Sequence, residues 1–240
     1  MKFAVCSSNF GSWSDPHVAV RTARAARAGG WDGYFVWDHL AFVWGPPSAD
    51  PWVTLAAVAS TTDGLTLGTA VTPLPRRRPQ VVAEQLRTLE RLNSGHVVLG
   101  AGLGGNEREF IEFGESFDPH GRAVLLDEGL QLVRRLWDGP VWVGGQSRAA
   151  LRRASRWDGW IPNSLEPHRM TMTAEELAEK VSRIGRTEGF DVAFNGYSEP
   201  GESVREYADA GATWWLENVH DMRGDVDALI GRIEAGPPSA

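Results

Sequence analysis

The sequence has little of the residue type that builds cross-links and metal clusters: Cys6 is the single cysteine among 240 residues. One cysteine excludes an intramolecular disulfide and any metal site built from several cysteines. On an apolar first strand, Cys6 is expected to be a small buried hydrophobic residue. The six histidines are scattered, and no two of them stand at helical ligand spacing beside an acid. A metal site is therefore not expected.

Positive charge and long apolar runs are also scarce. The formal net charge is −7, with 24 Lys and Arg against 31 Asp and Glu, which disfavours a general nucleic-acid-binding surface. No stretch approaches the ~18 consecutive apolar residues of a membrane-spanning helix. The start, Met1 to Ser8, becomes polar too soon for a signal peptide. These features favour a cytoplasmic protein without a nucleic-acid or membrane partner.

Short apolar segments alternate with amphipathic or alanine-rich segments along the whole chain. We expect strands at 3–7, 31–37, 65–71, 96–101, 141–143, 158–162, 191–196 and 212–216. We expect helices at 18–28, 51–61, 79–93, 121–137, 147–156, 173–188, 202–210 and 226–234. This alternation favours a parallel sheet, and the length matches one (β/α)₈ barrel of ~250 residues. The sequence thus predicts an α/β protein with a single TIM-barrel domain over 1–235 and a flexible tail over 236–240.

An internal similarity favours a closed barrel over an open sheet. Trp31-Asp32-Gly33, at the second expected strand, recurs as Trp157-Asp158-Gly159 at the sixth, and each follows an Ala/Arg-rich helix. In an eight-stranded barrel these strands would lie half a barrel apart. A three-residue match can also recur by chance in a chain with 11 tryptophans.

Asp38 and His39 come directly after the second expected strand. The carboxyl ends of parallel strands are where α/β folds place ligand-binding and catalytic groups. The alternative is that Asp38 caps the next turn and His39 is a satisfied polar residue. Trp37 and Trp44, which flank His39, are the tryptophans that we expect near a flat aromatic ligand.

Two glycine-rich turns and one arginine run are further candidates. The run from Gly100 to Gly105 ends the fourth strand, where missing Cβ atoms would let the backbone approach a ligand closely, although it does not match a dinucleotide-binding fingerprint. Gly144 and Gly145 lead into a helix start that would attract phosphate, with Ser147 as either a phosphate ligand or an N-cap. Residues 76–78 are either an anion-binding loop or a solvated charge run.

Read in order, several motifs resemble the bacterial luciferase-like flavin-dependent oxidoreductases. The motifs are Trp37-Asp38-His39-Leu40, Asp50-Pro51-Trp52, Leu67 to Pro73, Gly100 to Gly105, Glu109 to Gly114, the Arg122-to-Trp137 helix, Val143-Gly144-Gly145 and Trp157-Asp158-Gly159. The similarity covers nearly the whole chain, and the order and spacing of the motifs make it specific.

The resemblance implies a (β/α)₈ barrel that binds FMN or the deazaflavin F420 at the carboxyl ends of its strands. It places the ring against Ala70-Val71, with a non-prolyl cis peptide in that bulge, and the phosphate at the Gly144-Gly145 turn. His39 would lie beside the ring and exchange a proton with the substrate, and Glu107 is the candidate for a second catalytic acid. The expected cofactor-binding residues are Asp38, Ala70, Val71, Thr72, Gly102, Gly104, Gly144, Gly145 and Ser147.

One departure from the family pattern is a missing insertion. Only Asp138-Gly139-Pro140 stands between Trp137 and Val141, where many relatives carry a long segment that shields the active site. We therefore expect a short variant of the barrel, with a more open cofactor face. A second departure is that the glycines of the fourth strand are followed by Asn106 and Glu107 instead of an immediate glutamate, which is why Glu107 is only a candidate acid.

The resulting prediction is a homodimeric oxidoreductase that uses F420 or FMN, with a slight preference for F420. It would carry out hydride transfer or monooxygenation on a small organic substrate. The alternative is a flavin-binding or storage protein that kept the barrel and lost turnover. A barrel hydrolase has no support, because neither a metal cluster nor a Gly-x-Ser-x-Gly turn is present.

Overall fold

The computed structural model of the chain describes residues 1–94, 96–186 and 188–240. The strands are β1 (Lys2–Ser7), β2 (Gly33–Val36), β3 (Thr66–Thr69), β4 (Thr72–Pro73), β5 (Val97–Gly102), β6 (Val141–Gly144), β7 (Gly159–Ile161), β8 (Leu165–Glu166), β9 (Arg169–Met170), β10 (Asp191–Gly196) and β11 (Trp214–Val219). The α-helices are α1 (Pro16–Ala28), α2 (Pro51–Ala59), α3 (Pro79–Leu92), α4 (Arg108–Ile111), α5 (Pro119–Leu136), α6 (Arg148–Ala154), α7 (Ala174–Ile184), α8 (Arg205–Asp209) and α9 (Val226–Glu234). Short 3₁₀-helices are η1 (Gly11–Ser14), η2 (Ala41–Trp44) and η3 (Leu74–Arg76).

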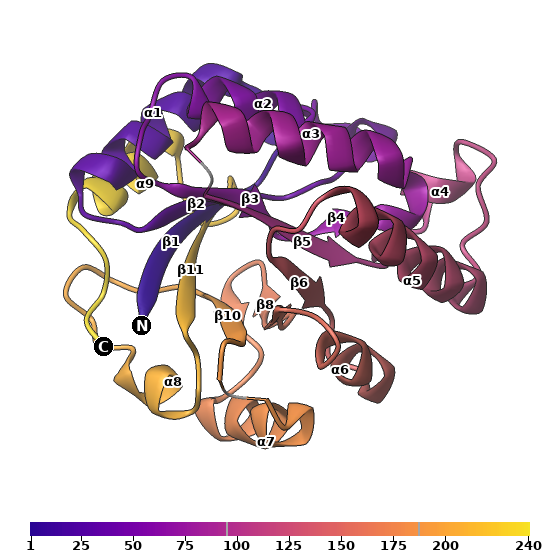
Figure 1. Cartoon of the computed structure of the whole chain (residues 1–240). Helices are drawn as coiled ribbons and strands as arrows, with labels where there is room; N and C mark the ends of the chain where they lie inside the picture. The colour runs from indigo at the N-terminus through magenta and orange to yellow at the C-terminus, as the bar shows by residue number, and fades with distance from the viewer. Residues whose placement is uncertain (95, 187) are drawn as a thin grey trace.

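Eight parallel strands close into a barrel. They pair in the order β1, β2, β3, β5, β6, β7, β10 and β11, and β11 returns to β1 along a register from Lys2↔Trp214 to Ser7↔Val219. Figure 1 shows the helices outside the strands, with α1, α2 and α3 on one side and α7 and α8 on the opposite side. The predicted single (β/α)₈ barrel is confirmed.

Helix starts in this chain are set by capping residues. Asp15, Asp50 and Asp118 each precede a proline at the first helical position, and each carboxylate accepts a backbone N–H of the first turn. The helix expected to reach residue 188 ends at Ile184 instead. The reason is Gly185, which adopts the left-handed conformation, φ +69°, that terminates helices.

The third expected strand is interrupted. β3 ends at Thr69 and β4 begins at Thr72, and the Ala70–Val71 peptide bond between them is cis. The non-prolyl cis peptide implied by the family resemblance is therefore confirmed. The sequence did not predict α4 or the β8–β9 hairpin, because elements of four and two residues are too short to show a periodic apolar pattern.

The repeated Trp-Asp-Gly tripeptide has the same structural role at both of its positions. Asp32 accepts the backbone N–H of Phe3 at 2.8 Å, at the start of β1, and Asp158 accepts that of Val141 at 2.9 Å, at the start of β6. Each aspartate thus ties the strand that it precedes to the strand before it. β2 and β7 lie four strands apart in the closed order, so the expected half-barrel separation is confirmed.

Aromatic rings fill the barrel interior. Phe35, Trp142 and Trp214 lie with ring centroids 5.4–6.1 Å apart, and Cys6 is fully buried in the same cluster. Burial raises the pKa of the Cys6 thiol to about 12, so this cysteine is a packing residue, as predicted. In the described parts of the chain, no helix is both long and apolar enough to cross a membrane.

The last five residues are attached to the barrel in this structure. Ser239 donates its backbone N–H to Glu202 at 2.9 Å and accepts that of Val204 at 2.8 Å, and Pro238 is buried. These contacts follow from the return of the chain past α8 after α9. The mobility expected for 236–240 stays a prediction.

The carboxyl ends of the strands form the mouth of the barrel. Its longer loops are 37–50 after β2, 103–118 after β5 and 162–173 after β7. The connection from α5 to β6 is only residues 137–140, so the predicted absence of a long insertion is confirmed. This connection leads into the amino end of β6, at the end of the barrel opposite the mouth, so it does not determine how open the mouth is.

Candidate functional site

His39 stands at the mouth, three residues beyond β2, with 35% of its side chain exposed. Asn9 holds its backbone on both sides, accepting the N–H of His39 at 3.0 Å and donating to its carbonyl oxygen at 2.9 Å. The imidazole stands edge-on to the rings of Phe10, Trp37 and Trp44, with centroids 5.8–6.1 Å away. The structure therefore places His39 at the mouth with both flanking tryptophans beside its ring, and the nearness of these tryptophans to a flat ligand stays a prediction.

Glu109, on α4, lies directly behind His39. The Nδ1 atom of His39 is 2.5 Å from Glu109 Oε1, and the glutamate side chain is 1% exposed. The other carboxylate oxygen accepts a hydrogen bond from Arg76 Nη1. Because Nδ1 faces this buried acid, the ring orientation is fixed and Nε2 is left for a group in the mouth.

The acid beside His39 differs from the one expected. Glu107 is exposed and lies just before α4, whereas Glu109 makes the contact with the imidazole. Two residues correspond to about 200° around a helix, so side chains at 107 and 109 point in opposite directions. Glu107 lies closer to the glycines in sequence, but the direction in which each side chain points places Glu109, and not Glu107, beside the imidazole. The helix is too short to be predicted from the sequence.

Asp38 anchors two arginines instead of facing a cofactor. Its side chain is fully buried, and it accepts hydrogen bonds from Arg76 Nη2 at 2.9 Å and from Arg77 Nε and Nη2 at 2.8 and 2.7 Å. Both of its oxygens are therefore engaged. The cofactor role expected of Asp38 stays a prediction, and in this structure its side chain serves the two arginines. Of the run 76–78, Arg76 and Arg77 are internal ion-pair partners, whereas Arg78 is exposed.

The bulge between β3 and β4 is enclosed by two of the expected glycines. An added Cβ would lie 2.7 Å from the Val71 side chain at Gly102 and 3.1 Å from it at Gly144. Glycine is thus required for β5 and β6 to approach the bulge. Ala70 and Val71 are partly exposed, and they form an apolar wall at the mouth.

Thr72 and Gly104 support this wall from behind. The buried Thr72 hydroxyl donates to Thr69 Oγ1 at 3.1 Å. Gly104 has φ +81°, and an added Cβ would lie 2.9 Å from the Phe110 ring. Arg122, which the sequence did not single out, donates to the carbonyl oxygen of Gly104 at 2.6 Å. Arg122 and Phe110 thus shape the loop after β5 around Gly104, whereas Thr72 ties β4 to the end of β3.

The turn after β6 has the features of an anion cradle. Gly145 has φ +114°, and the Ser147 hydroxyl accepts the backbone N–H of Ala150 at 3.1 Å, which makes Ser147 the N-cap of α6. Of the two roles predicted for Ser147, the N-cap is therefore confirmed. The backbone N–H groups of Arg148 and Ala149 belong to the first helical turn and have no partner within the helix.

His220, which follows β11, is a buried residue of the mouth that sequence reasoning missed. Its Nε2 atom lies 2.7 Å from the Tyr197 hydroxyl, and its ring centroid lies 5.5 Å from that of Trp37. Burial, helped by the nearby charge of Arg223, lowers the pKa of His220 to about 4, so the ring is neutral near pH 7. The strand-end rule that identified His39 missed it because the last strand was expected to end at residue 216.

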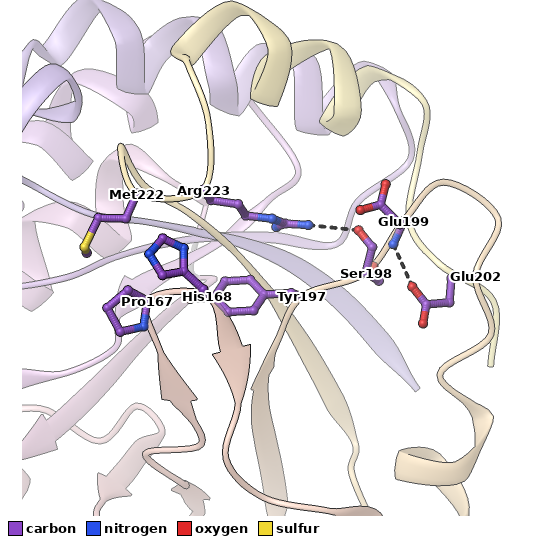
Figure 2. A pocket seen from close by; sticks show the side chains of 8 residues that line it. All are labelled: Pro167, His168, Tyr197, Ser198, Glu199, Glu202, Met222 and Arg223. Carbon is purple, nitrogen blue, oxygen red and sulfur yellow. Dashed lines mark hydrogen bonds between the residues drawn. The ribbon is translucent and has the colours of Figure 1, made fainter.

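A cavity of about 280 Å³ lies on the same side of the barrel, beside the ends of β10 and β11 (Figure 2). Arg223 donates to the carbonyl oxygen of Ser198 at 2.9 Å, and Glu199 donates its N–H to Glu202 at 2.8 Å. The residues that line it are Pro167, His168, Tyr197, Ser198, Glu199, Glu202, Met222 and Arg223. Several polar groups among these lining residues bond to one another. The residues therefore form a polar wall of the mouth. Within the described residues, no group of three or more His, Cys, Asp or Glu side chains is placed to hold a metal ion.

Comparisons with known proteins concern the family and the fold of the chain. The family model of luciferase-like monooxygenases matches residues 1–140. An F420-dependent hydroxymycolic acid dehydrogenase of Mycobacterium tuberculosis is 37% identical over 179 residues, covering 59% of this chain and 48% of that protein. An F420-dependent glucose-6-phosphate dehydrogenase of Nakamurella multipartita is 31% identical over 182 residues, covering 62% and 52%. The chain thus spans about half the length of each.

A solved structure has nearly the same extent as this chain. It is an F420-dependent secondary alcohol dehydrogenase in complex with an F420–acetone adduct, with a TM-score of 0.78, 16% identity and coverage of 97% of both chains. At this identity the likeness concerns the fold.

Proposed function

The chain belongs to the luciferase-like monooxygenase family, and from this premise we propose that it is an oxidoreductase that uses F420 or FMN. Two relatives are named as F420-dependent dehydrogenases, which favours F420. The observation that carries the proposal is the pairing of His39 with the buried Glu109 at the mouth. Nothing in the described residues or the relatives favours a binding or storage protein that has lost turnover, and the contact between His39 and Glu109 supports a role in proton transfer.

The residues at the mouth suit a flavin-type cofactor. Ala70 and Val71 offer an apolar wall for a flat ring, and the first turn of α6 offers N–H groups and the Ser147 hydroxyl to a phosphate. When bound, such a cofactor supplies the acceptor or donor of a hydride. The protein's own contribution is to orient the substrate, exclude water and move a proton.

His39 is placed to move that proton. In the oxidation of an alcohol, the hydride leaves the carbinol carbon and the hydroxyl proton passes to His39 Nε2, so that a carbonyl compound forms. Glu109 would stabilise the resulting imidazolium through Nδ1. In the reverse direction, His39 would return the proton to the carbonyl oxygen.

The direct test is a binding titration with F420, FMN and FAD, followed by turnover of a panel of alcohols with the cofactor that binds. We expect F420 to bind more tightly than FMN, and FAD to bind weakly. Cofactor binding without alcohol-dependent reduction of F420 across the panel would contradict the dehydrogenase proposal. Turnover with reduced FMN and oxygen would instead indicate monooxygenase chemistry.

Ser147→Asp is expected to weaken cofactor binding by at least roughly tenfold, about 1.4 kcal/mol. Aspartate is as good an N-cap as serine, so α6 should keep its start, but its negative charge would repel a bound phosphate. The matched control is Ser147→Asn, which keeps the cap without the charge and should bind within about threefold of the wild type. Equal dissociation constants for the two variants would place the phosphate elsewhere.

We also propose that the protein is a cytoplasmic homodimer, and light scattering at micromolar concentration tests its assembly. The particle mass should be about twice the 26.3 kDa of one chain. The motivation is the family membership together with exposed apolar side chains on two neighbouring helices, Val53 on α2 and Val81 on α3. A constant monomer mass across a hundredfold dilution series would rule out the dimer.

A further inference from the structure

Arg122, near the start of α5, carries a buried charge without a counter-charge. It is 6% exposed, and no carboxylate of the described residues forms an ion pair with it. Two other buried arginines do have such partners: Arg153 Nε lies 2.8 Å from Asp127, and Arg232 Nη2 lies 3.9 Å from Glu217. A buried charge is costly unless it is paired. A bound anion would supply the partner that Arg122 lacks.

The side edge of the Arg122 guanidinium is unused. Nη1 donates to the carbonyl oxygens of Gly104 at 2.6 Å and Leu103 at 3.3 Å. Within the described part of the chain, Nε is buried without a hydrogen-bond partner, and Nη2 makes no hydrogen bond. Arg153 shows what this edge binds, because its Nε and Nη2 donate to the two carboxylate oxygens of Asp127 at 2.8 and 2.9 Å. A planar acid with two oxygens fits such a fork.

Arg122 lines a cavity of about 250 Å³ between η3, α4 and the start of α5. The apolar side chains that line it are Pro75, Phe110 and Leu125. Ser116 adds a hydroxyl, which accepts a backbone N–H at 3.2 Å and keeps its own proton to donate. The cavity therefore combines one cation, one hydroxyl donor and an apolar surface.

The two acids near Arg122 do not neutralise it. Asp118 is the N-cap of α5, and its carboxylate accepts the backbone N–H of Gly121. Glu115 lines the cavity but is exposed, so water and salt screen its charge. The rings of Phe110 and Phe117, with centroids 5.3 and 3.7 Å from the guanidinium carbon, stabilise a cation but carry no net charge.

We propose that this cavity binds a small carboxylate with an apolar body. The two oxygens would meet Nε and Nη2 of Arg122, and the apolar part would contact Phe110 and Leu125. The cavity is smaller than the about 300–1,000 Å³ of sites for drug-sized ligands, so a single aromatic ring or a chain of about six carbons is the expected size.

The proposed site is distinct from the His39–Glu109 pair. None of the residues that line the cavity contacts the imidazole. Phe110 and Glu109 are neighbours on α4, and their side chains point about 100° apart around the helix. A carboxylate bound to Arg122 would therefore hold the loop of residues 103–118, which carries Glu109, without occupying the position of a substrate beside His39.

Binding of 4-fluorobenzoate, followed by fluorine NMR, is the first test. We expect a dissociation constant below about 1 mM. The neutral 4-fluorobenzamide, which keeps the ring, and acetate, which keeps the charge, should each bind at least about tenfold more weakly. With the benzoate bound, hydrogen exchange of the backbone amides in 103–118 should slow, because the ligand opposes local opening of this loop.

Two variants place the ligand at Arg122. Leu125→Glu adds a negative charge at a side chain that is 49% exposed and lines the cavity, and it should weaken benzoate binding at least about fivefold. The matched control is Val124→Glu, at a neighbouring side chain that is 43% exposed and does not line the cavity, and it should bind within about twofold of the wild type.

Arg122→Lys keeps the charge but loses the fork, and it should weaken benzoate binding at least about tenfold. Its control is Arg135→Lys, at an exposed arginine in the last turn of α5, which should leave binding unchanged. Melting temperatures are recorded for all variants. If Arg122→Lys does not fold, the Leu125→Glu and Val124→Glu pair still decides the outcome.

Three results would overturn the inference. They are equal affinities for the benzoate and the benzamide, equal losses in Leu125→Glu and Val124→Glu, and displacement of the benzoate by F420 or FMN. Displacement would mean that Arg122 serves the cofactor and not a separate acid. Because no measurement uses turnover, failure of this inference leaves the proposed oxidoreductase function untouched, and failure of that function leaves this site untouched.

Discussion

A His39→Gln variant is expected to bind its cofactor normally and to turn over at least about a hundredfold more slowly. Proton transfer by a positioned side chain typically contributes about 10²–10⁴-fold, or roughly 3–5 kcal/mol of the barrier. Glutamine keeps the polarity and approximate size of histidine but cannot exchange a proton at neutral pH. Since 35% of the His39 side chain is exposed, its loss should barely affect packing.

The measurement is the rate constant for turnover of a neutral alcohol, with cofactor affinity and melting temperature recorded on the same samples. His17→Gln, an exposed histidine on α1, is the matched control and should match the wild type in all three. If His39→Gln turns over within about threefold of the wild-type rate, His39 takes no part in the chemical step. Unfolding of this variant would show instead that the ring serves packing.

Asp38→Asn is expected to destabilise the fold by about 3–5 kcal/mol, because it leaves two buried guanidiniums without their common carboxylate. Arg76 and Arg77 together donate three hydrogen bonds of 2.7–2.9 Å to this side chain. Asparagine offers one acceptor oxygen and turns an N–H₂ group towards the cations. For a chain of this length the loss corresponds to roughly 6–20 °C in melting temperature.

Calorimetry or urea unfolding measures the effect. The control is Asp227→Asn, which breaks the ion pair with Arg21 whose two side chains are 55% and 80% exposed, and it should cost less than about 1 kcal/mol. Similar losses in the two variants would mean that the buried network contributes no more than a surface pair. If the Asp38→Asn variant is stable and turns over normally, the buried network does not position Glu109.

Much of this arrangement could be predicted from strand ends and glycine positions. The apolar run that ends at Trp37 locates His39 because the carboxyl end of a parallel strand always reaches the same face of the barrel. The Gly144-Gly145 turn could be found for the same reason, since a strand leads directly into a capped helix start. Both signals are local in sequence, and the parallel barrel brings both of them to its mouth.

The partners of these residues could not be predicted, because they depend on pairings distant in sequence. Arg76 meets Asp38 across 38 positions and Glu109 across 33, and no local pattern distinguishes such a buried arginine from a solvated one. The choice between Glu107 and Glu109 depended on the phase of one helical turn. His220 was missed because the last strand continues three residues further than its apolar run indicates.

The register that joins β1 to β11 bears on how the chain folds as it leaves the ribosome. Lys2 pairs with Trp214, so the first strand is synthesised more than two hundred residues before its neighbour on that side. Until β11 emerges, the nascent chain holds an open sheet with a free edge of backbone N–H and C=O groups on β1, which is a surface prone to aggregation. Such distant pairing slows folding, and the nascent protein would depend most on chaperones during this interval.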